Sequence, residues 1–222
     1  MLDSINVPIP NQKVDSVVAN YRNILSEEMN EVLAQSPFAM QKATPEGLLN
    51  NFVADLVFNI ASELYDPTAD SPIDFCLLNY GGLRTSLPKG DITRARVFEL
   101  MPFENEMVVL TLSGLKTAEL FDYLARSERG MPVSGIKLGI KNGQVGSVLI
   151  QGKAFDPERN YKVVTSDYLA EGGDRMTFFL DPIEANMVGM RIRDAITFHM
   201  QRETKNGNSL FAQIDGRIFY MD

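Results

Sequence analysis

The chain has 222 residues, of which 45% are hydrophobic and 23% are charged, so it can bury the core of a globular domain. Its formal charge of −8, from 29 acidic and 21 basic residues, argues against nucleic acid as a partner, because duplex binders present basic surfaces to phosphates. A single cysteine, Cys76, excludes an intrachain disulfide and a cysteine-rich metal site. Its place in an apolar segment predicts a buried, inert thiol.

The N-terminal region divides into a polar leader and a predicted helix. Residues 1–12 are polar and carry two prolines, which predicts an extended leader or linker ahead of one domain at 13–222. Apolar residues at helical spacing, with charged residues between them, then predict a long amphipathic helix over 14–34.

The middle of the chain predicts two further helices and two strands. Thr-Pro-Glu at 44–46 is typical of a helix start, with threonine as the N-cap and proline in the first turn, and an apolar helical face follows over 48–64. Residues 73–78 are too few and too continuously apolar for a surface helix, so we expect a strand covered on both faces. A strand over 107–112 precedes a helix over 113–126 that a serine caps.

The C-terminal half is expected to be richer in strands. Asn142-Gly143 separates two segments of strand character and predicts a hairpin, because both residues tolerate the positive φ of a type I′ turn. Three more elements are predicted: a strand over 161–165, a helix over 187–201 and a final strand over 218–220. Helices first, followed by strands with interspersed helices, indicate an α+β domain with a mixed β-sheet and packed helices.

Two predicted loops at strand ends combine a glycine pair with a charged residue. In NYGGLR at 79–84, the glycines let the backbone turn and present N–H groups, while Arg84 offers a permanently charged fork for phosphate or carboxylate. In SDYLAEGGD at 166–174, Tyr168 offers an aromatic plane and Asp174 an acceptor for the vicinal hydroxyls of a sugar. Taken singly, the first loop is equally a tight turn with a solvated arginine, and the second a turn with an acidic face.

A third loop, MPFEN at 101–105, carries an aromatic residue. Phe103 stands between a proline and two polar residues, which fits a loop better than a core-facing strand, although a phenylalanine beside a strand is usually core. A loop aromatic is suited to base stacking. Two glycine-pair loops of opposite charge and two nearby aromatic residues together predict a nucleoside site.

Together and in this order, the loops resemble the C-terminal domain of the 5′-nucleotidase family, which includes periplasmic UDP-sugar hydrolases and surface ecto-5′-nucleotidases. The resemblance extends from about residue 46 to the C-terminus. The motifs that carry it are NYGGLR at 79–84, GDIT at 90–93, PF at 102–103, LSG at 112–114 and YLAEGGD at 168–174.

The resemblance implies a role for each loop. Asn79 and Arg84 are expected to make contacts on the base side and to phosphate, Phe103 and Tyr168 to stack on the base, and Asp174 to bind ribose. The glycines of the two pairs, Gly81, Gly82, Gly172 and Gly173, belong to the same implied substrate-binding site. Such stacking contributes about 1–3 kcal/mol per base and tolerates base identity.

The chain departs from the family at two places. Family members carry a phosphate-binding arginine shortly before a helix start, whereas residues 41–51 contain no arginine, and Lys42 lacks the bidentate fork. Catalysis in the family resembles two-metal hydrolysis by an N-terminal metallophosphatase domain. The single histidine, His199, cannot supply that ligand set, and its predicted helical position between charged neighbours indicates a structural or solvated residue.

We therefore expect this chain to contain no catalytic residue, metal ligand or cofactor, and the pair of divalent metal ions to lie on a separate metallophosphatase domain or subunit. The predicted function is the nucleotide-binding half of a 5′-nucleotidase-type phosphohydrolase in nucleotide catabolism, inactive alone. One alternative is a non-catalytic nucleotide- or nucleoside-binding module. Another is a domain whose pocket has degenerated into an interaction surface.

The cellular location follows mainly from the resemblance, which implies the periplasm or the cell surface. No segment approaches the roughly 18 apolar residues of a membrane span, and the first residues lack the basic and apolar regions of a signal peptide. An acidic chain without disulfides is compatible with a periplasmic location, and a cytoplasmic one stays an alternative.

Overall fold

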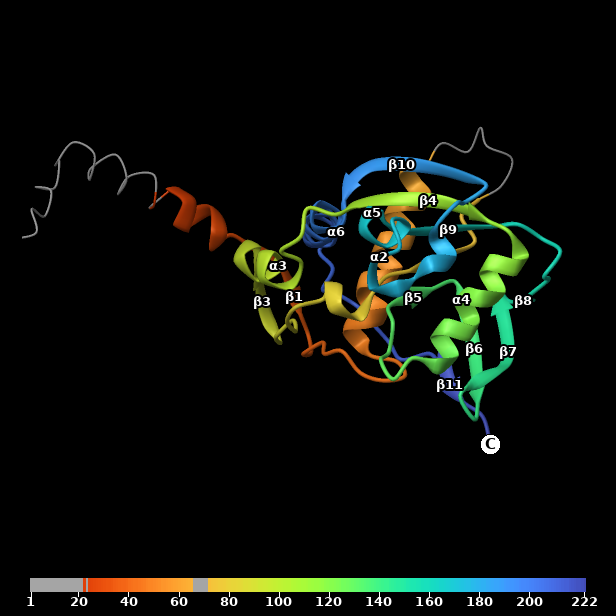
Figure 1. Cartoon of the computed structure of the whole chain (residues 1–222). Coiled ribbons are helices and arrows are strands. Elements are labelled where there is room, and N and C mark those ends of the chain that lie inside the picture. The colour runs from red at the N-terminus through yellow and green to blue at the C-terminus, as the bar shows by residue number, and fades with distance from the viewer. Residues whose placement is uncertain (1–21, 23, 66–71) are drawn as a thin grey trace, which may run out of the picture.

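The structure, a computed structural model, describes residue 22, residues 24–65 and residues 72–222 (Figure 1). Within this range the strands and helices follow one another as β1 (Val32–Ser36), α2 (Leu48–Leu64), β2 (Phe75–Leu77), β3 (Gly90–Thr93), α3 (Arg94–Leu100), β4 (Glu106–Leu112), α4 (Gly114–Arg126), β5 (Val133–Ser134), β6 (Ile136–Lys141), β7 (Gln144–Ile150), β8 (Lys153–Ala154), β9 (Tyr161–Ser166), α5 (Asp167–Ala170), β10 (Glu184–Arg191), α6 (Ile192–Lys205) and β11 (Ile218–Tyr220). No helix in the described part of the chain has the length and hydrophobicity to span a bilayer.

The central sheet has five strands in the order β10-β4-β9-β2-β5 and is mixed, because β2 and β9 are parallel whereas its other pairs are antiparallel. A second sheet has the order β11-β6-β7-β8, and β1 pairs with β3. Figure 1 shows β10 and β4 lying side by side at one edge of the molecule. The predicted α+β architecture with a mixed sheet is confirmed.

Side chains alternate between the two faces of the central sheet, as the two-residue period of a strand requires. Cys76 of β2 and Val164 of β9 pack in a core with α2 and α6. Phe75 and Val163, one position earlier on each strand, pack on the other face with α4 and the second sheet. Both faces are therefore covered, which confirms a buried strand within the predicted range 73–78, although the strand itself is limited to Phe75–Leu77. The buried Cys76 thiol is also confirmed, and burial raises its pKa well above its usual range.

Two predicted elements at the start of the chain are corrected. The leader at 1–12 and the start of the first predicted helix lie outside the described residues. Helix covers 24–29, but Val32–Ser36 forms β1, so the prediction of helix as far as residue 34 was wrong. The apolar residues of this segment are compatible with a helix or a strand, and antiparallel pairing with β3 selects the strand.

The predicted capping role of Thr44 is also corrected. Helix α2 begins after Gly47 without a side-chain cap. The Thr44 hydroxyl instead accepts a hydrogen bond from the Gly130 N–H at 3.0 Å.

The predicted helix over 187–201 is correct only in its second part. Glu184–Arg191 is β10, which pairs with β4 along Glu184–Met187, and α6 begins at Ile192. A register shift after Met187 and a positive φ of 78° at Gly189 mark the irregular end of this strand. The partner strand lies about 75 positions earlier in the chain, so local spacing could not reveal the pairing.

Two local predictions are confirmed by backbone geometry. Ser113 caps α4, and its hydroxyl accepts a hydrogen bond from the Lys116 N–H at 3.3 Å. Asn142 and Gly143 have φ values of 52° and 73° and join β6 to β7 in the expected hairpin. The helix α3, capped by the Thr93 hydroxyl, was not predicted.

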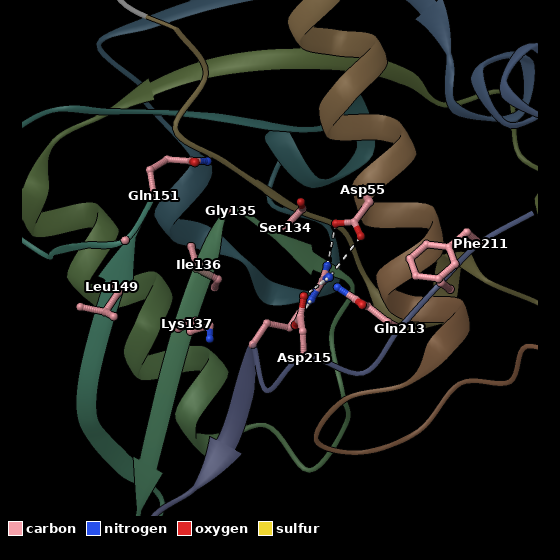
Figure 2. A pocket seen from close by; sticks show the side chains of 13 residues that line it. Asp55, Ser134, Gly135, Ile136, Lys137, Leu149, Gln151, Phe211, Gln213 and Asp215 are labelled. Atoms are coloured by element: carbon pink, nitrogen blue, oxygen red, sulfur yellow. Dashed lines mark hydrogen bonds and ion pairs between the residues drawn. The ribbon is translucent and has the colours of Figure 1, made fainter.

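A buried arginine ties the C-terminal segment to α2. The Arg217 guanidinium donates hydrogen bonds to Asp55 of α2 at 2.7 and 3.1 Å, to Asp215 at 2.8 and 3.0 Å and to the Val133 carbonyl at 2.8 Å. Figure 2 shows Asp55 and Asp215 beside one cavity, and dashed lines mark the hydrogen bonds that each carboxylate accepts from the arginine. Burial by itself lowers the pKa of Arg217, because it disfavours the charged form. The hydrogen bonds to Asp55 and Asp215 have the larger combined effect, so the pKa of Arg217 is raised.

We predict that Arg217→Met destabilises the fold by roughly 3 kcal/mol, because it removes the cation shared by several carboxylates in a buried setting. Urea denaturation measures the change. The matched control is Arg126→Met, whose side chain is 75% exposed and 4.0 Å from Asp122; we expect it to change stability by less than about 0.5 kcal/mol. Equal effects of the two variants would contradict the structural role of Arg217.

Candidate functional site

Strand direction brings the three predicted loops to one edge of the central sheet. β2 and β9 are parallel, so their carboxyl ends point the same way, and NYGGLR and SDYLAEGGD follow those ends. β4 is antiparallel to β9, and its residue Met107 pairs with Ser166, so the loop at 101–105 precedes β4 at the same edge. Three segments far apart in the sequence therefore meet.

The loops enclose a cavity of about 360 Å³. It is lined by Asn79, Gly81, Gly82, Arg84, Phe103, Asn105, Tyr168 and Asp174. Seven of the nine residues predicted for the site are in this set, and the other two, Gly172 and Gly173, immediately precede Asp174. Phe103 and Tyr168 are 41% and 44% exposed as whole residues, so both are accessible to a ligand. Asn105 was not predicted individually, although it ends the MPFEN loop.

The two glycines of NYGGLR have different structural roles. Tyr80–Gly82 forms a 3-10 turn, and neither glycine has a positive φ, so the turn itself does not demand glycine. A Cβ at Gly82 would lie 2.7 Å from Oδ1 of Asn79, whereas a Cβ at Gly81 would have its nearest contact at 3.6 Å. Gly82 is therefore needed for the close approach of the Asn79 side chain.

The glycines of SDYLAEGGD are both structurally required. Ser166 caps the short helix α5 by accepting a hydrogen bond from the Leu169 N–H at 3.2 Å. The chain then leaves the helix through Gly172, whose φ of 83° is in the region that favours glycine. A Cβ at Gly173 would come within 2.5 Å of the Tyr168 carbonyl oxygen and of its ring. This close packing sets the position of the tyrosine.

Asp174 connects the loops through hydrogen bonds. Its carboxylate accepts one from Asn79 Nδ2 at 2.6 Å and one from the Tyr168 hydroxyl at 3.0 Å. Its backbone N–H donates to the Tyr168 hydroxyl at 3.2 Å, and its carbonyl accepts from the Tyr123 hydroxyl at 3.2 Å. The carboxylate is thus oriented before any ligand arrives.

The loop at 101–105 is held from both sides. Asn105 Nδ2 donates to Oδ1 of Asp167 at 2.8 Å, and the same oxygen accepts from the Tyr168 N–H at 2.7 Å, which links Phe103 and Tyr168 through their loops. Buried Arg193 of α6 donates to the Pro102 carbonyl at 3.3 Å and pairs with Glu104. The hydrogen bond from Arg193 lowers the pKa of Glu104.

Comparison with known proteins identifies the family. The family model described as 5′-nucleotidase, C-terminal domain, matches residues 27–181. The chain belongs to this family. An apyrase of Tabanus yao is 27% identical over 219 residues, which cover 88% of this chain and 39% of the apyrase. Protein UshA of Salmonella pullorum is 34% identical over 108 residues, which cover 46% of this chain and 19% of UshA.

The fold agrees with this assignment. A solved 5′-nucleotidase precursor from Thermus thermophilus superposes with a TM-score of 0.76 at 22% identity, over 94% of this chain and 43% of that one. The predicted family and fold class are confirmed. The chain spans less than half of the length of these relatives.

Two cations near NYGGLR differ from one another in their surroundings. Lys42, considered as a substitute for the missing family arginine, donates to the carbonyls of Tyr80 at 3.1 Å and Leu83 at 2.5 Å and lies 3.9 Å from the Tyr80 ring centroid. It supports the loop from outside the cavity lining. Arg84 lines the cavity, donates to the Gly81 carbonyl at 3.3 Å and forms no ion pair with any described residue.

The predicted helical position of His199 is confirmed on α6. Its ring meets Phe52 edge-on with centroids 5.6 Å apart, and burial lowers its pKa. Within the described ranges, no three histidine, cysteine, aspartate or glutamate side chains cluster closely enough to hold a metal ion.

We predict that Gly173→Ala destabilises the protein by about 1–3 kcal/mol, because the added methyl group overlaps the Tyr168 carbonyl and ring. Gly81→Ala is the matched control within the same site, and it meets only ordinary van der Waals contacts. Thermal unfolding of both variants checks this. A Gly81→Ala variant as unstable as Gly173→Ala would show that the packing has been misassigned.

Proposed function

We propose that this chain binds a nucleotide in the cavity between the three loops, as the substrate-binding part of a 5′-nucleotidase-type phosphohydrolase in nucleotide catabolism. The observation that carries the proposal is the composition of that cavity. Two accessible aromatic rings, Phe103 and Tyr168, share it with an oriented carboxylate, Asp174, and an arginine without an ion pair to any described residue, Arg84. Aromatic rings suit the base, a carboxylate suits the hydroxyls of the ribose, and a guanidinium suits the phosphate.

The base is assigned to the aromatic pair. Stacking buries the apolar faces of a base and contributes about 1–3 kcal/mol per base. The loops that carry the two rings are linked through Asp167, so the rings are supported together. Asn105 lines the same cavity, and with its Nδ2 bonded to Asp167, its amide oxygen is the group that would accept a hydrogen bond from the base.

The ribose is assigned to Asp174 and the phosphate to Arg84. An ionised carboxylate has about four lone-pair sites, and Asn79 and Tyr168 occupy two of those on Asp174. The remaining sites suit the vicinal hydroxyls of a ribose. The planar guanidinium of Arg84 suits bidentate contact with a phosphate, and its charge is not offset by an ion pair with a described residue.

The hydrolytic step is assigned to a metallophosphatase domain or subunit that holds a pair of divalent metal ions, as in two-metal phosphoester hydrolysis. In this scheme the present chain binds and orients the nucleotide. The family match and the share of longer relatives that the chain spans support this division. We also propose a location in the periplasm or at the cell surface, which rests on the family resemblance.

Binding tests the proposal directly. We predict that the chain binds AMP, and that Phe103→Ala and Tyr168→Ala each weaken binding between about fivefold and about a hundredfold through lost stacking. Tyr168→Phe should weaken it less, because the ring remains while the hydrogen bonds to Asp174 are lost. Isothermal titration calorimetry measures the dissociation constants.

Two exposed aromatic residues elsewhere on the chain, Phe211 and Tyr220, provide matched controls. Neither lines the cavity, so Phe211→Ala and Tyr220→Ala should leave AMP binding unchanged. If AMP, adenosine and UDP-glucose all fail to bind at millimolar concentration, the nucleotide-binding proposal is wrong and the alternative of a degenerated pocket is favoured.

A separate prediction concerns catalysis. The purified chain, given AMP and Mg²⁺, Mn²⁺ or Zn²⁺, should release no phosphate, because its one histidine cannot supply the metal ligands of a two-metal site. A phosphate-release assay checks this. Phosphate release that Arg84→Gln or Asp174→Asn abolishes would refute the assignment of hydrolysis to a separate domain or subunit. Binding without any metallophosphatase partner in the cell would favour the non-catalytic module instead.

A further inference from the structure

Asn105 is the cavity residue whose side chain is suited to read the edge of a base. It ends the MPFEN loop, two residues after Phe103, and lines the cavity together with Phe103 and Tyr168. A base that stacks on aromatic rings leaves its polar edge free for hydrogen bonds. An asparagine amide carries donors at one end and an acceptor at the other. The end that faces the ligand therefore decides which bases the amide recognises.

Asp167 fixes one end of this amide. Its Oδ1 accepts hydrogen bonds from Nδ2 of Asn105 at 2.8 Å and from the Tyr168 N–H at 2.7 Å. This oxygen offers only lone pairs, so the amide nitrogen of Asn105 turns toward it. The reversed amide would bring two oxygen atoms together without a proton between them. Oδ1 of Asn105, to which no described residue donates a hydrogen bond, is left as the polar atom available to a ligand.

The backbone on both sides of this contact is also held in place. The Asn105 carbonyl accepts a hydrogen bond from the Ile192 N–H of α6 at 2.9 Å, and β4 begins at the next residue. Asp167 is the first residue of α5 and follows Ser166, which pairs with Met107 of β4. Both Asn105 and Asp167 are half-buried. Sheet pairing therefore sets the contact between their side chains.

We propose that Asp167 is a positioning residue that makes the site selective for bases with an exocyclic amino group, namely adenine and cytosine. The inference rests on the proposed function and narrows its substrate class. The amino groups of adenine and cytosine donate hydrogen bonds, whereas hypoxanthine and uracil carry a carbonyl oxygen at the same ring position. Oδ1 of Asn105 accepts from the amine and repels the carbonyl. A site built to receive an N–H group discriminates against an analogue that lacks it, because a polar group is then left unpaired.

The ring N–H groups of hypoxanthine and uracil are not equivalent donors. In hypoxanthine the ring N–H lies beside a carbonyl, and in uracil it lies between two carbonyls. An acceptor that approaches such an N–H also comes close to a carbonyl oxygen, and the two oxygens repel each other. An exocyclic amine projects beyond the ring and carries two hydrogens, so the fixed oxygen of Asn105 reaches one of them without this repulsion.

Calorimetry with the full chain and matched nucleotides tests this inference. We expect AMP to bind about tenfold more tightly than IMP, in which an oxygen replaces the amino group. Purine riboside 5′-monophosphate, which has neither group, should bind with an affinity between these two. CMP should likewise bind more tightly than UMP. Asn105→Ala should bring the dissociation constants of AMP and IMP to within about threefold of each other.

Two substitutions of Asp167 separate positioning from general structural support. Asp167→Ala removes the accepting oxygen, frees the Asn105 amide to rotate and should reduce the preference for AMP over IMP to below about threefold. Asp167→Asn retains an accepting oxygen and should preserve the preference, although the charge is lost. A purely structural role would weaken both nucleotides equally in Asp167→Ala. Glu171→Ala, which removes an exposed carboxylate outside the cavity lining, is the charge control and should change neither affinity.

The outcomes distinguish this inference from the proposal on which it rests. If IMP binds as tightly as AMP while Phe103→Ala weakens both, nucleotide binding stands and the base selectivity is wrong. The role of Asp167 is overturned if Asp167→Ala, shown to be folded by thermal unfolding, keeps the wild-type preference. Should that variant not fold, Asn105→Ala decides, and an unchanged preference in it overturns the inference. If no nucleotide binds at millimolar concentration, the proposed function is wrong and the inference falls with it.

Discussion

The site depends on the burial and direction of one strand, β9. All six of its residues are buried, and it lies between β2, to which it is parallel, and β4, to which it is antiparallel. Covered on both faces and hydrogen-bonded on both edges, it has little freedom to change register, since a shift by one residue would exchange its two core-facing sets of side chains. The three loops meet at one edge because of this arrangement.

The loops are then held by polar contacts that connect them to one another. Asp174 accepts hydrogen bonds from residues of two loops, and Asp167 links the third loop to Tyr168. Close approaches at Gly82 and Gly173 leave little space for alternative positions of Asn79 and Tyr168. Binding groups that are positioned before the ligand arrives lose less conformational entropy on binding. Most arginines in the described part of the fold form ion pairs, whereas Arg84 in the cavity forms none with a described residue and keeps its charge available to a ligand.

The sequence predicted correctly those elements that depend only on residues close together in the chain. The hairpin at Asn142-Gly143 and the capping serine of α4 depend on neighbouring residues alone, and both are confirmed. The errors occurred where a distant partner decides the structure. Val32–Ser36 is a strand because of β3, and the segment before α6 is a strand because of β4. Asn105 and Arg193 were missed because their roles follow from contacts across 62 and about 90 positions.

The sequence by itself determined the family, the α+β class and the chemistry of the three loops, because glycine pairs, aromatics and charges at strand ends are visible in order along the chain. Only the tertiary structure decided that these loops share one cavity, since that follows from the relative direction of β2, β4 and β9. It also decided that Lys42 supports a loop, whereas Arg84 lines the cavity and forms no ion pair with a described residue. Charge is a property of a residue, but its availability depends on which distant groups the fold places beside it.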